Sequence, residues 1–274
     1  MNRRSPLVVF GVYIGLLLVS LWTIFPLLFT IITSFKPDLA GLSEGNPFIF
    51  TPRMDNYFRV WRQTDFLRYL FNSTLISISA CAVSILMGLP AAYALSRMRF
   101  RGRRFWAQGF LSVRLAPPVA FVVPFFMMFK TLRLLDTHLA LILVYTLFLL
   151  PFSIWMFSAY IRQIPIEAEE AALVDGYTRF GALFKVVLPQ IRPIVGAVAL
   201  LNISAAWNEF LFALILTSSN SVTLPVAISS FLGERGVFWG QMAAAAVLIM
   251  LVPIIISIII HKTMAKAMIL EIER

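Results

Sequence analysis

The amino-acid sequence predicts an all-α membrane protein with six transmembrane helices and both termini in the cytoplasm. Of its 274 residues, 60% are hydrophobic and 13% are charged, whereas ordinary soluble domains contain about 45–50% apolar and about 25% charged residues. The mean hydropathy is +0.87. A soluble domain with so little charge could not cover its surface, so the bilayer is the expected solvent.

Six apolar runs are each long enough to cross the membrane, because a hydrocarbon core of about 30 Å needs roughly 20 helical residues. The runs cover approximately residues 7–35, 71–96, 105–129, 139–160, 194–216 and 241–260. Several contain proline, which membrane helices tolerate where neighbouring groups satisfy the freed backbone. The first run is longer than a secretory signal and is expected to remain as an anchor. No linker or internal repeat is visible, so residues 1–274 are expected to form a single transmembrane domain.

The distribution of Lys and Arg predicts the orientation of the spans. Arg3 and Arg4 precede the first run, and the link at 97–104, between the second and third, is rich in Arg and has no acidic residue. Short loops with such a positive excess stay in the cytoplasm. The same alternation places the connection at 161–193 and the C-terminal tail in the cytoplasm, and the connection at 36–70 outside as a cap.

Several kinds of chemistry are excluded or disfavoured by composition. One Cys excludes an intramolecular disulfide, and two widely spaced His make a zinc site built by this chain unexpected. The positive charges lie between apolar runs and form no basic face for nucleic acid. No Gly-Lys pair occurs, so the chain has no P-loop for nucleotide phosphates. A polytopic membrane enzyme would need clustered His, Asp or Ser at a membrane face, and no such cluster is found. We therefore assign no catalytic and no metal-binding residue.

The connection at 161–193 is predicted to form two short helices joined by a bend. Pro165 begins the first helix, Gly176 ends it in a left-handed conformation, and Thr178 caps the second, which Pro189 ends. This pattern predicts a compact elbow in the cytoplasm.

The side chains of this elbow suit a protein groove better than a lipid surface. Ala168, Ala171 and Ala172 leave the first helix thin, while Phe180 and Phe184 offer an apolar anchor at helical spacing. An amphipathic segment on the membrane is the alternative. Four acidic residues within nine positions make the segment a poor ligand for anionic lipid.

The elbow also resembles a known sequence motif. The run Glu170-Ala171-Ala172, then Gly176, Val186 and Leu188-Pro189, is similar to the EAA loop in membrane subunits of bacterial ABC importers, where Ile is common at the position of Val186. Further stretches resemble the carbohydrate-uptake branch with its maltose-type permeases: Pro117-Pro118, residues 151–155 and residues 207–210.

The resemblance implies a type I ABC importer transmembrane domain in the bacterial cytoplasmic membrane. It implies that this loop docks into a cytoplasmic ATPase, present in two copies, which binds ATP and Mg while this chain holds no cofactor. It further implies a second, related permease chain and an external solute-binding protein. In such a socket Glu170 and Asp175 are expected to make polar contacts, Ala171 and Ala172 to allow close approach, and Gly176 to form the turn.

A candidate substrate path lies in the third and fifth runs. Arg114 and Glu209 are ionisable residues well inside apolar runs, and such residues usually face a bundle interior or a wet cavity. Polar and aromatic residues accompany Glu209: Asn202, Ser204, Trp207 and Asn208. Hydrogen-bonding groups beside aromatic surface suit a sugar, which presents hydroxyl edges and apolar faces.

Two alternatives for these residues remain open at this stage. Arg114 and Glu209 could pair with each other or with the partner chain and fix helix register. Glu209 could instead serve a cationic solute such as a polyamine, because the coupling loop is shared by importers of other solutes.

Overall fold

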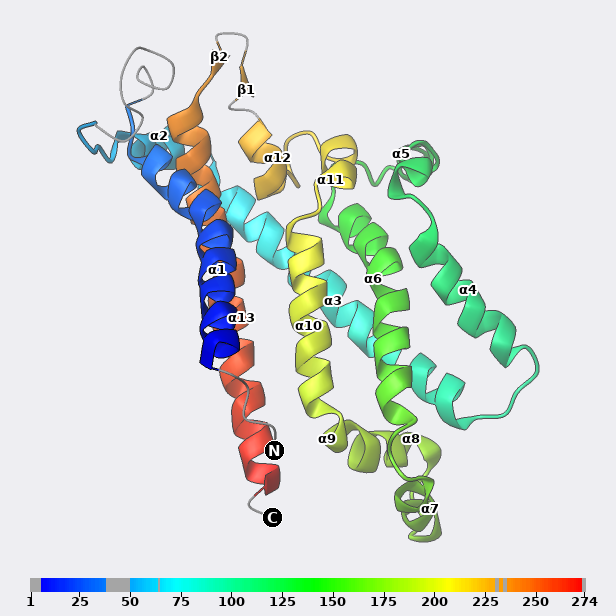
Figure 1. Cartoon of the computed structure of the whole chain (residues 1–274). Helices are drawn as coiled ribbons and strands as arrows, with labels where there is room; N and C mark the ends of the chain where they lie inside the picture. The colour runs from blue at the N-terminus through cyan, green and yellow to red at the C-terminus, as the bar shows by residue number, and fades with distance from the viewer. Residues whose placement is uncertain (1–5, 38–49, 64, 230–231, 234–235, 273–274) are drawn as a thin grey trace. The chain divides into compact units, whose positions relative to one another are not determined.

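The structure is a computed structural model that describes residues 6–37, 50–63, 65–229, 232–233 and 236–272 (Figure 1). It confirms the all-helical class, with one short hairpin in addition. Arg3, Arg4 and Arg274, which belong to the predicted cytoplasmic ends, lie outside the described residues.

The first half of the chain contains helices α1 to α6. Their bounds are α1 Pro6–Ser34, α2 Asp55–Gln63, α3 Phe66–Arg97, α4 Arg103–Leu115, the 3-10 helix η2 Pro118–Phe121, α5 Val122–Thr131 and α6 His138–Ile161. Helices α1, α3 and α6 are each long and apolar enough to cross a membrane. They correspond to the first, second and fourth predicted spans.

The second half begins with short helices and ends with a long one. Its elements are α7 Ile166–Val174, α8 Arg179–Ala182, the π-helical turn η3 Leu183–Val187, α9 Leu188–Gln190, α10 Arg192–Trp207, α11 Leu211–Leu216, α12 Leu224–Ser229, β1 Leu232–Gly233, β2 Gly236–Val237 and α13 Trp239–Ile272. The two strands pair antiparallel, with Leu232 opposite Val237. Helix α13 is the fourth long apolar helix.

The third predicted span is bent by 97° between α4 and the segment Pro118–Thr131. Ala116 and Pro117 are both extended, with ψ angles of 132° and 125°. Because a residue before proline avoids the α conformation, the consecutive prolines at 117 and 118 account for the break.

The fifth predicted span consists of two helices, α10 and α11. Helix α10 begins after a bend of 81° at Ile191 and ends at Trp207. The Glu209 carboxylate then accepts hydrogen bonds from the backbone N–H groups of Phe212 and Ala213, at 2.9 and 3.2 Å. This bonding satisfies the free amides at the start of α11, so a new helix begins there.

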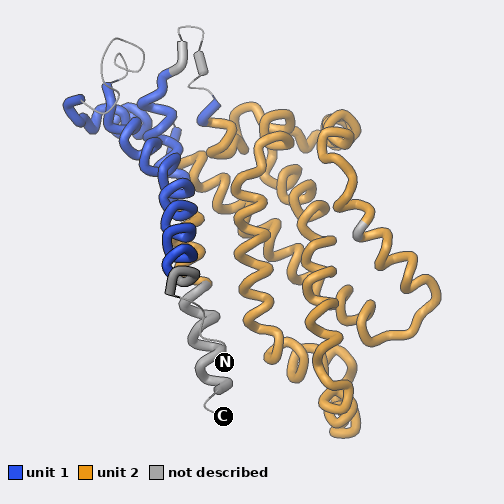
Figure 2. The backbone as a smooth tube through the Cα atoms, in the orientation of Figure 1, with its two compact units in different colours: residues 1–66, 228–251 blue, residues 67–227, 252–274 orange. Residues whose placement is uncertain are grey.

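The chain forms two compact units (Figure 2). Unit 1 comprises residues 1–66 and 228–251, and unit 2 comprises residues 67–227 and 252–274. In unit 1, the end of α1 is joined to α2 by a hydrogen bond of 2.7 Å between the hydroxyl groups of Ser34 and Tyr57.

Unit 2 contains two apolar clusters. One joins residues of α3, α5, α6 and α11, and the other joins residues of α3, α6, η3 and α10. A small polar contact links three of these helices: the Asn202 amide donates to the Ser153 hydroxyl at 2.8 Å, and Ser153 shares a bond of 2.8 Å with Ser84. Small residues and interhelical hydrogen bonds are the usual means of helix packing in lipid.

Candidate functional site

The elbow, defined here as residues 166–190 from α7 to α9, lies at one end of unit 2, and α5 and α11 lie at the other end (Figure 1). Its local signals act as predicted. Pro165 occupies the position just before α7, Gly176 has a φ of 88°, and the Thr178 hydroxyl accepts from the Gly181 N–H at 3.1 Å. The second helix continues past the predicted stop at Pro189 to Gln190. Pro189 lacks an N–H and disfavours regular α-helix before it, consistent with the π-helical turn η3.

A buried ion pair attaches the elbow to the end of α3. The Arg97 Nε atom lies 2.6 Å from Oε1 of Glu169, and the Arg97 Nη2 atom donates to the Ile164 carbonyl at 2.6 Å. The two side chains are 10% and 5% exposed. Because water is largely excluded, this pair and its extra hydrogen bond hold α7 against α3 in one geometry.

The predicted coupling residues divide into exposed and buried groups. Glu170, Ala171, Asp175, Gly176 and Phe180 are exposed, whereas Ala172 is buried and Leu188 and Pro189 are half-buried. Ala172 therefore packs inside unit 2 and is not free to approach a partner.

Sequence reasoning predicted the apolar anchor of Phe180 and Phe184 but missed Val174 at the end of α7. Val174 is 87% exposed, and Phe180 is 62% exposed with its ring 5.1 Å from that of Phe184. The sequence did offer one signal for Val174, because it is an apolar residue outside every predicted span.

A cavity of about 150 Å³ lies beside the break in the third span. It is lined by Pro118, Tyr145, Phe148, Leu149, Ala205, Ala206, Glu209 and Phe212. Of the six residues predicted for the substrate path, Glu209 is the one that lines it. The lining therefore combines the Glu209 carboxylate and the Tyr145 phenol hydroxyl with the aromatic rings of Phe148 and Phe212.

The other predicted path residues have separate surroundings. Asn202 and Trp207 are buried at 1% exposure, and Ser204 is half-buried. The exposed Asn208 donates to the Ser204 carbonyl of its own helix at 2.8 Å. The Arg114 guanidinium lies 4.7 Å from the centre of the Phe152 ring. Since Glu209 is bonded to the α11 amides, the structure does not pair Arg114 with Glu209.

Asp136, in the loop between α5 and α6, was not predicted as a structural residue. Its carboxylate accepts hydrogen bonds from the backbone N–H groups of residues 218–221, at 2.9 to 3.2 Å. Partial burial acts to raise the pKa of Asp136, but the four amide bonds outweigh it and hold the pKa well below its ordinary value.

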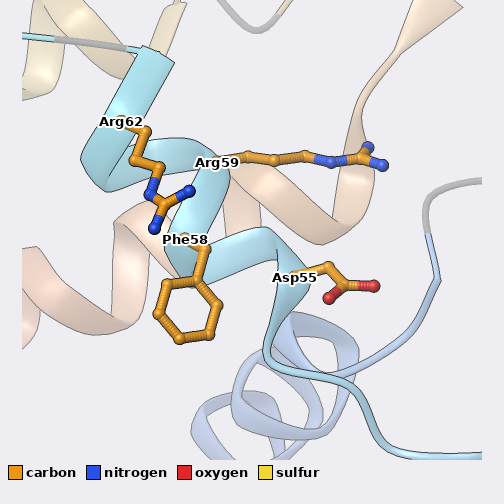
Figure 3. Close-up of a pocket in the computed structure, with 4 residues that line it drawn as sticks. All are labelled: Asp55, Phe58, Arg59 and Arg62. Carbon is orange, nitrogen blue, oxygen red and sulfur yellow. The ribbon is translucent and has the colours of Figure 1, made fainter.

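A second hollow belongs to unit 1 and lies on one face of α2 (Figure 3). It has a volume of about 370 Å³ and is lined by Asp55, Phe58, Arg59 and Arg62. Two guanidinium groups and one aromatic ring therefore border an open, mainly cationic site.

Comparison with known proteins identifies the chain. Residues 84–270 match the family described as "Binding-protein-dependent transport system inner membrane component". The chain belongs to this family. It is thus a multi-pass permease of the inner membrane and a subunit of an ABC importer, with a transport role and no catalysis of its own.

Individual relatives align with nearly the whole length of this chain. The chain is 32% identical to the inner membrane ABC transporter permease protein YcjP of Escherichia coli, covering 97% of this chain and 96% of YcjP. It is 33% identical to the trehalose/maltose transport system permease protein MalG of Thermococcus litoralis, covering 91% of each.

The fold matches a solved transporter. The structure of a bacterial ABC transporter that imports the acidic polysaccharide alginate superposes with a TM-score of 0.78 at 22% identity, over 96% of this chain and 99% of that chain. This likeness shows the fold, and the family match makes the chain a component of a binding-protein-dependent transport system.

Proposed function

We propose that this permease forms half of the translocation path for a sugar, from mono- to oligosaccharide or glycoside. The supporting relative is the trehalose/maltose permease MalG, at 33% identity over 91% of both chains. The observation that carries the proposal is the cavity lined by Glu209, Tyr145 and Phe148. A carboxylate and a phenol hydroxyl suit sugar hydroxyls, and an aromatic ring suits an apolar sugar face.

Glu209 has the central role in this proposal. Its carboxylate already accepts from two amides of α11, so its position is fixed while it lines the cavity. A charged acceptor held in this way can bind a hydroxyl without losing side-chain freedom. The alternative solute is a polyamine, whose cationic groups would be attracted to the same carboxylate.

Uptake in cells tests the sugar proposal. A strain lacking this permease should lose uptake of labelled maltose or trehalose, and the wild-type chain should restore it. Glu209→Gln should restore roughly tenfold less, because a charge-assisted hydrogen bond contributes about 1.5–3 kcal/mol. Gln163→Ala, which removes an exposed amide that does not line the cavity, is the matched control. Loss of putrescine uptake with unchanged sugar uptake would contradict the proposal.

We also propose that the elbow seats in the ATPase subunit. Its support is the buried Arg97–Glu169 pair, which joins the elbow to α3, and the apolar surface formed by Val174 and Phe180. If the ATPase subunits close on ATP, an elbow held in this way moves α3 and α10 with it. Glu170 and Asp175, both exposed, supply the polar contacts at the socket.

The proposed assembly has four kinds of protein component. This chain pairs with a second, related permease, most simply as a heterodimer. Two copies of the ATPase bind ATP and Mg below the membrane, and this chain binds neither. A solute-binding protein delivers the sugar from outside.

A further inference from the structure

Helix α2 is attached to the end of a membrane span. The Asn56 side-chain amide donates to the carbonyl groups of Ser34 and Lys36, at 2.8 and 2.7 Å. Ser34 is the last residue of the candidate span Phe10–Ser34. The Asn56 amide thereby caps carbonyl groups that a helix end leaves free.

The same asparagine contacts the start of a second span. A Cβ atom added to Gly240 would lie 2.9 Å from the Lys36 carbonyl oxygen and would clash with the Asn56 amide nitrogen. Gly240 is the second residue of the candidate span Trp239–Ile260. A third candidate span, Phe66–Arg97, begins three residues after α2 ends at Gln63. Helix α2 therefore lies next to the ends of candidate membrane spans, where lipid headgroups are expected.

The outward side of α2 has the composition of a membrane interface. Asn56 and Val60 are buried against the rest of unit 1, whereas Phe58 and Trp61 are 59% and 53% exposed. Arg62 is also exposed. Aromatic rings and long cationic side chains are the residue types enriched at the headgroup level of bilayers.

We propose that the hollow lined by Asp55, Phe58, Arg59 and Arg62 binds the phosphate of an anionic phospholipid in the outer leaflet. A guanidinium group matches phosphate in a forked, bidentate geometry. The negative charge of Asp55 is offset by Arg53, whose Nη1 atom lies 4.0 Å from the Asp55 carboxylate. The Phe58 ring contacts the glycerol and upper acyl region. A phospholipid is favoured over an acidic protein surface because α2 lies where lipid headgroups are expected.

Lipid retention tests this site. The complete importer complex is incubated in detergent with phosphatidylglycerol or phosphatidylcholine, and bound lipid is counted by native mass spectrometry. Wild type should retain phosphatidylglycerol preferentially. Arg62→Gln should weaken that retention about fivefold, the factor for one cationic residue at a charged bilayer surface. Arg62→Lys should keep part of it. Lys130→Gln, another exposed cation in a predicted outer segment, is the matched control and should have no effect.

Any of four results would overturn the proposal. Equal retention of both lipids, or equal retention by wild type and Arg62→Gln, would show that the hollow does not recognise the lipid phosphate. Displacement of phosphatidylglycerol by millimolar inorganic phosphate would assign the site to a free anion. A weaker response of ATP hydrolysis to the solute-binding protein in Arg62→Gln, with lipid retention unchanged, would assign the surface to that protein. Complex yield on purification reports folding of each variant.

Discussion

Asp136 joins two loops of unit 2 through a single carboxylate. The residue has a φ of 56°, a conformation that is uncommon outside glycine. Its partners at 218–221 lie 82 to 85 positions away in the sequence. Sequence patterns do not reveal such a contact, because nothing local to Asp136 identifies the amides it binds.

Removing this carboxylate should destabilise the permease in a pH-dependent way. We expect Asp136→Asn to lower the free energy of unfolding at pH 7 by about 1.5–3 kcal/mol, the net worth of one hydrogen bond to a charged group. Because the folded pKa is depressed, the stabilisation is present above the unfolded pKa near 3.8 and is lost as pH falls towards the folded pKa. The difference between variant and wild type should therefore shrink below about pH 4.

Thermal unfolding of the purified complex between pH 3 and pH 7 measures this difference. Asp55→Asn, which removes an exposed carboxylate from α2, is the control. A constant difference at all these pH values would show that the Asp136 charge is not what stabilises the loops.

The elbow illustrates what can be predicted for a single element. Its start, bend and cap follow from Pro165, Gly176 and Thr178, because each signal acts within a few residues. Its attachment could not be predicted, because Arg97 and Glu169 are 72 positions apart. No local pattern indicates that Glu169 pairs with Arg97.

The Arg97–Glu169 pair should be strongly coupled. Arg97→Met alone or Glu169→Leu alone leaves a buried charge without its partner and should cost about 3–5 kcal/mol of unfolding free energy. The double variant should recover most of this loss, since two apolar side chains can replace a buried pair. The melting temperatures of the four proteins give the coupling energy. If the loss of stability in the double variant equalled the sum of the two single losses, the Arg97–Glu169 pair would not hold α3 and α7 together.

The turn at Gly176 should be needed for the elbow to bind the ATPase. Nothing lies within 4 Å of a Cβ atom added there, so a substitution meets backbone strain and no clash. Gly176→Val should weaken co-purification of the ATPase about tenfold, because a β-branched residue resists a φ of 88°. Gly176→Asn tolerates that φ and should retain the ATPase. If Gly176→Val retained the ATPase in full, the turn would not be needed for docking.

At the scale of the whole molecule, composition and span length predicted the fold class, because lipid demands long apolar helices. They did not predict the two compact units or the break between α10 and α11. The break depends on the Glu209 carboxylate, which bonds to the amides of α11 and so begins a new helix. Glu209 lines a cavity, whereas Asn202 and Trp207 are packed inside the bundle, and the part of these residues in a substrate path stays a prediction.

Cross-linking from Val174 to the ATPase tests the central claim most directly, which is that the elbow receives force from a nucleotide-driven subunit. With Cys81, the single native cysteine, replaced by Ser, Val174→Cys offers a thiol at a site that is 87% exposed. A short bismaleimide should join it to a cysteine-containing ATPase subunit in the assembled complex, and the yield should change when ATP is added. Leu132→Cys, 58% exposed and directly after α5, should give no such product. Equal yields from the two positions, or none from Val174→Cys in a complex that retains its ATPase, would contradict the account.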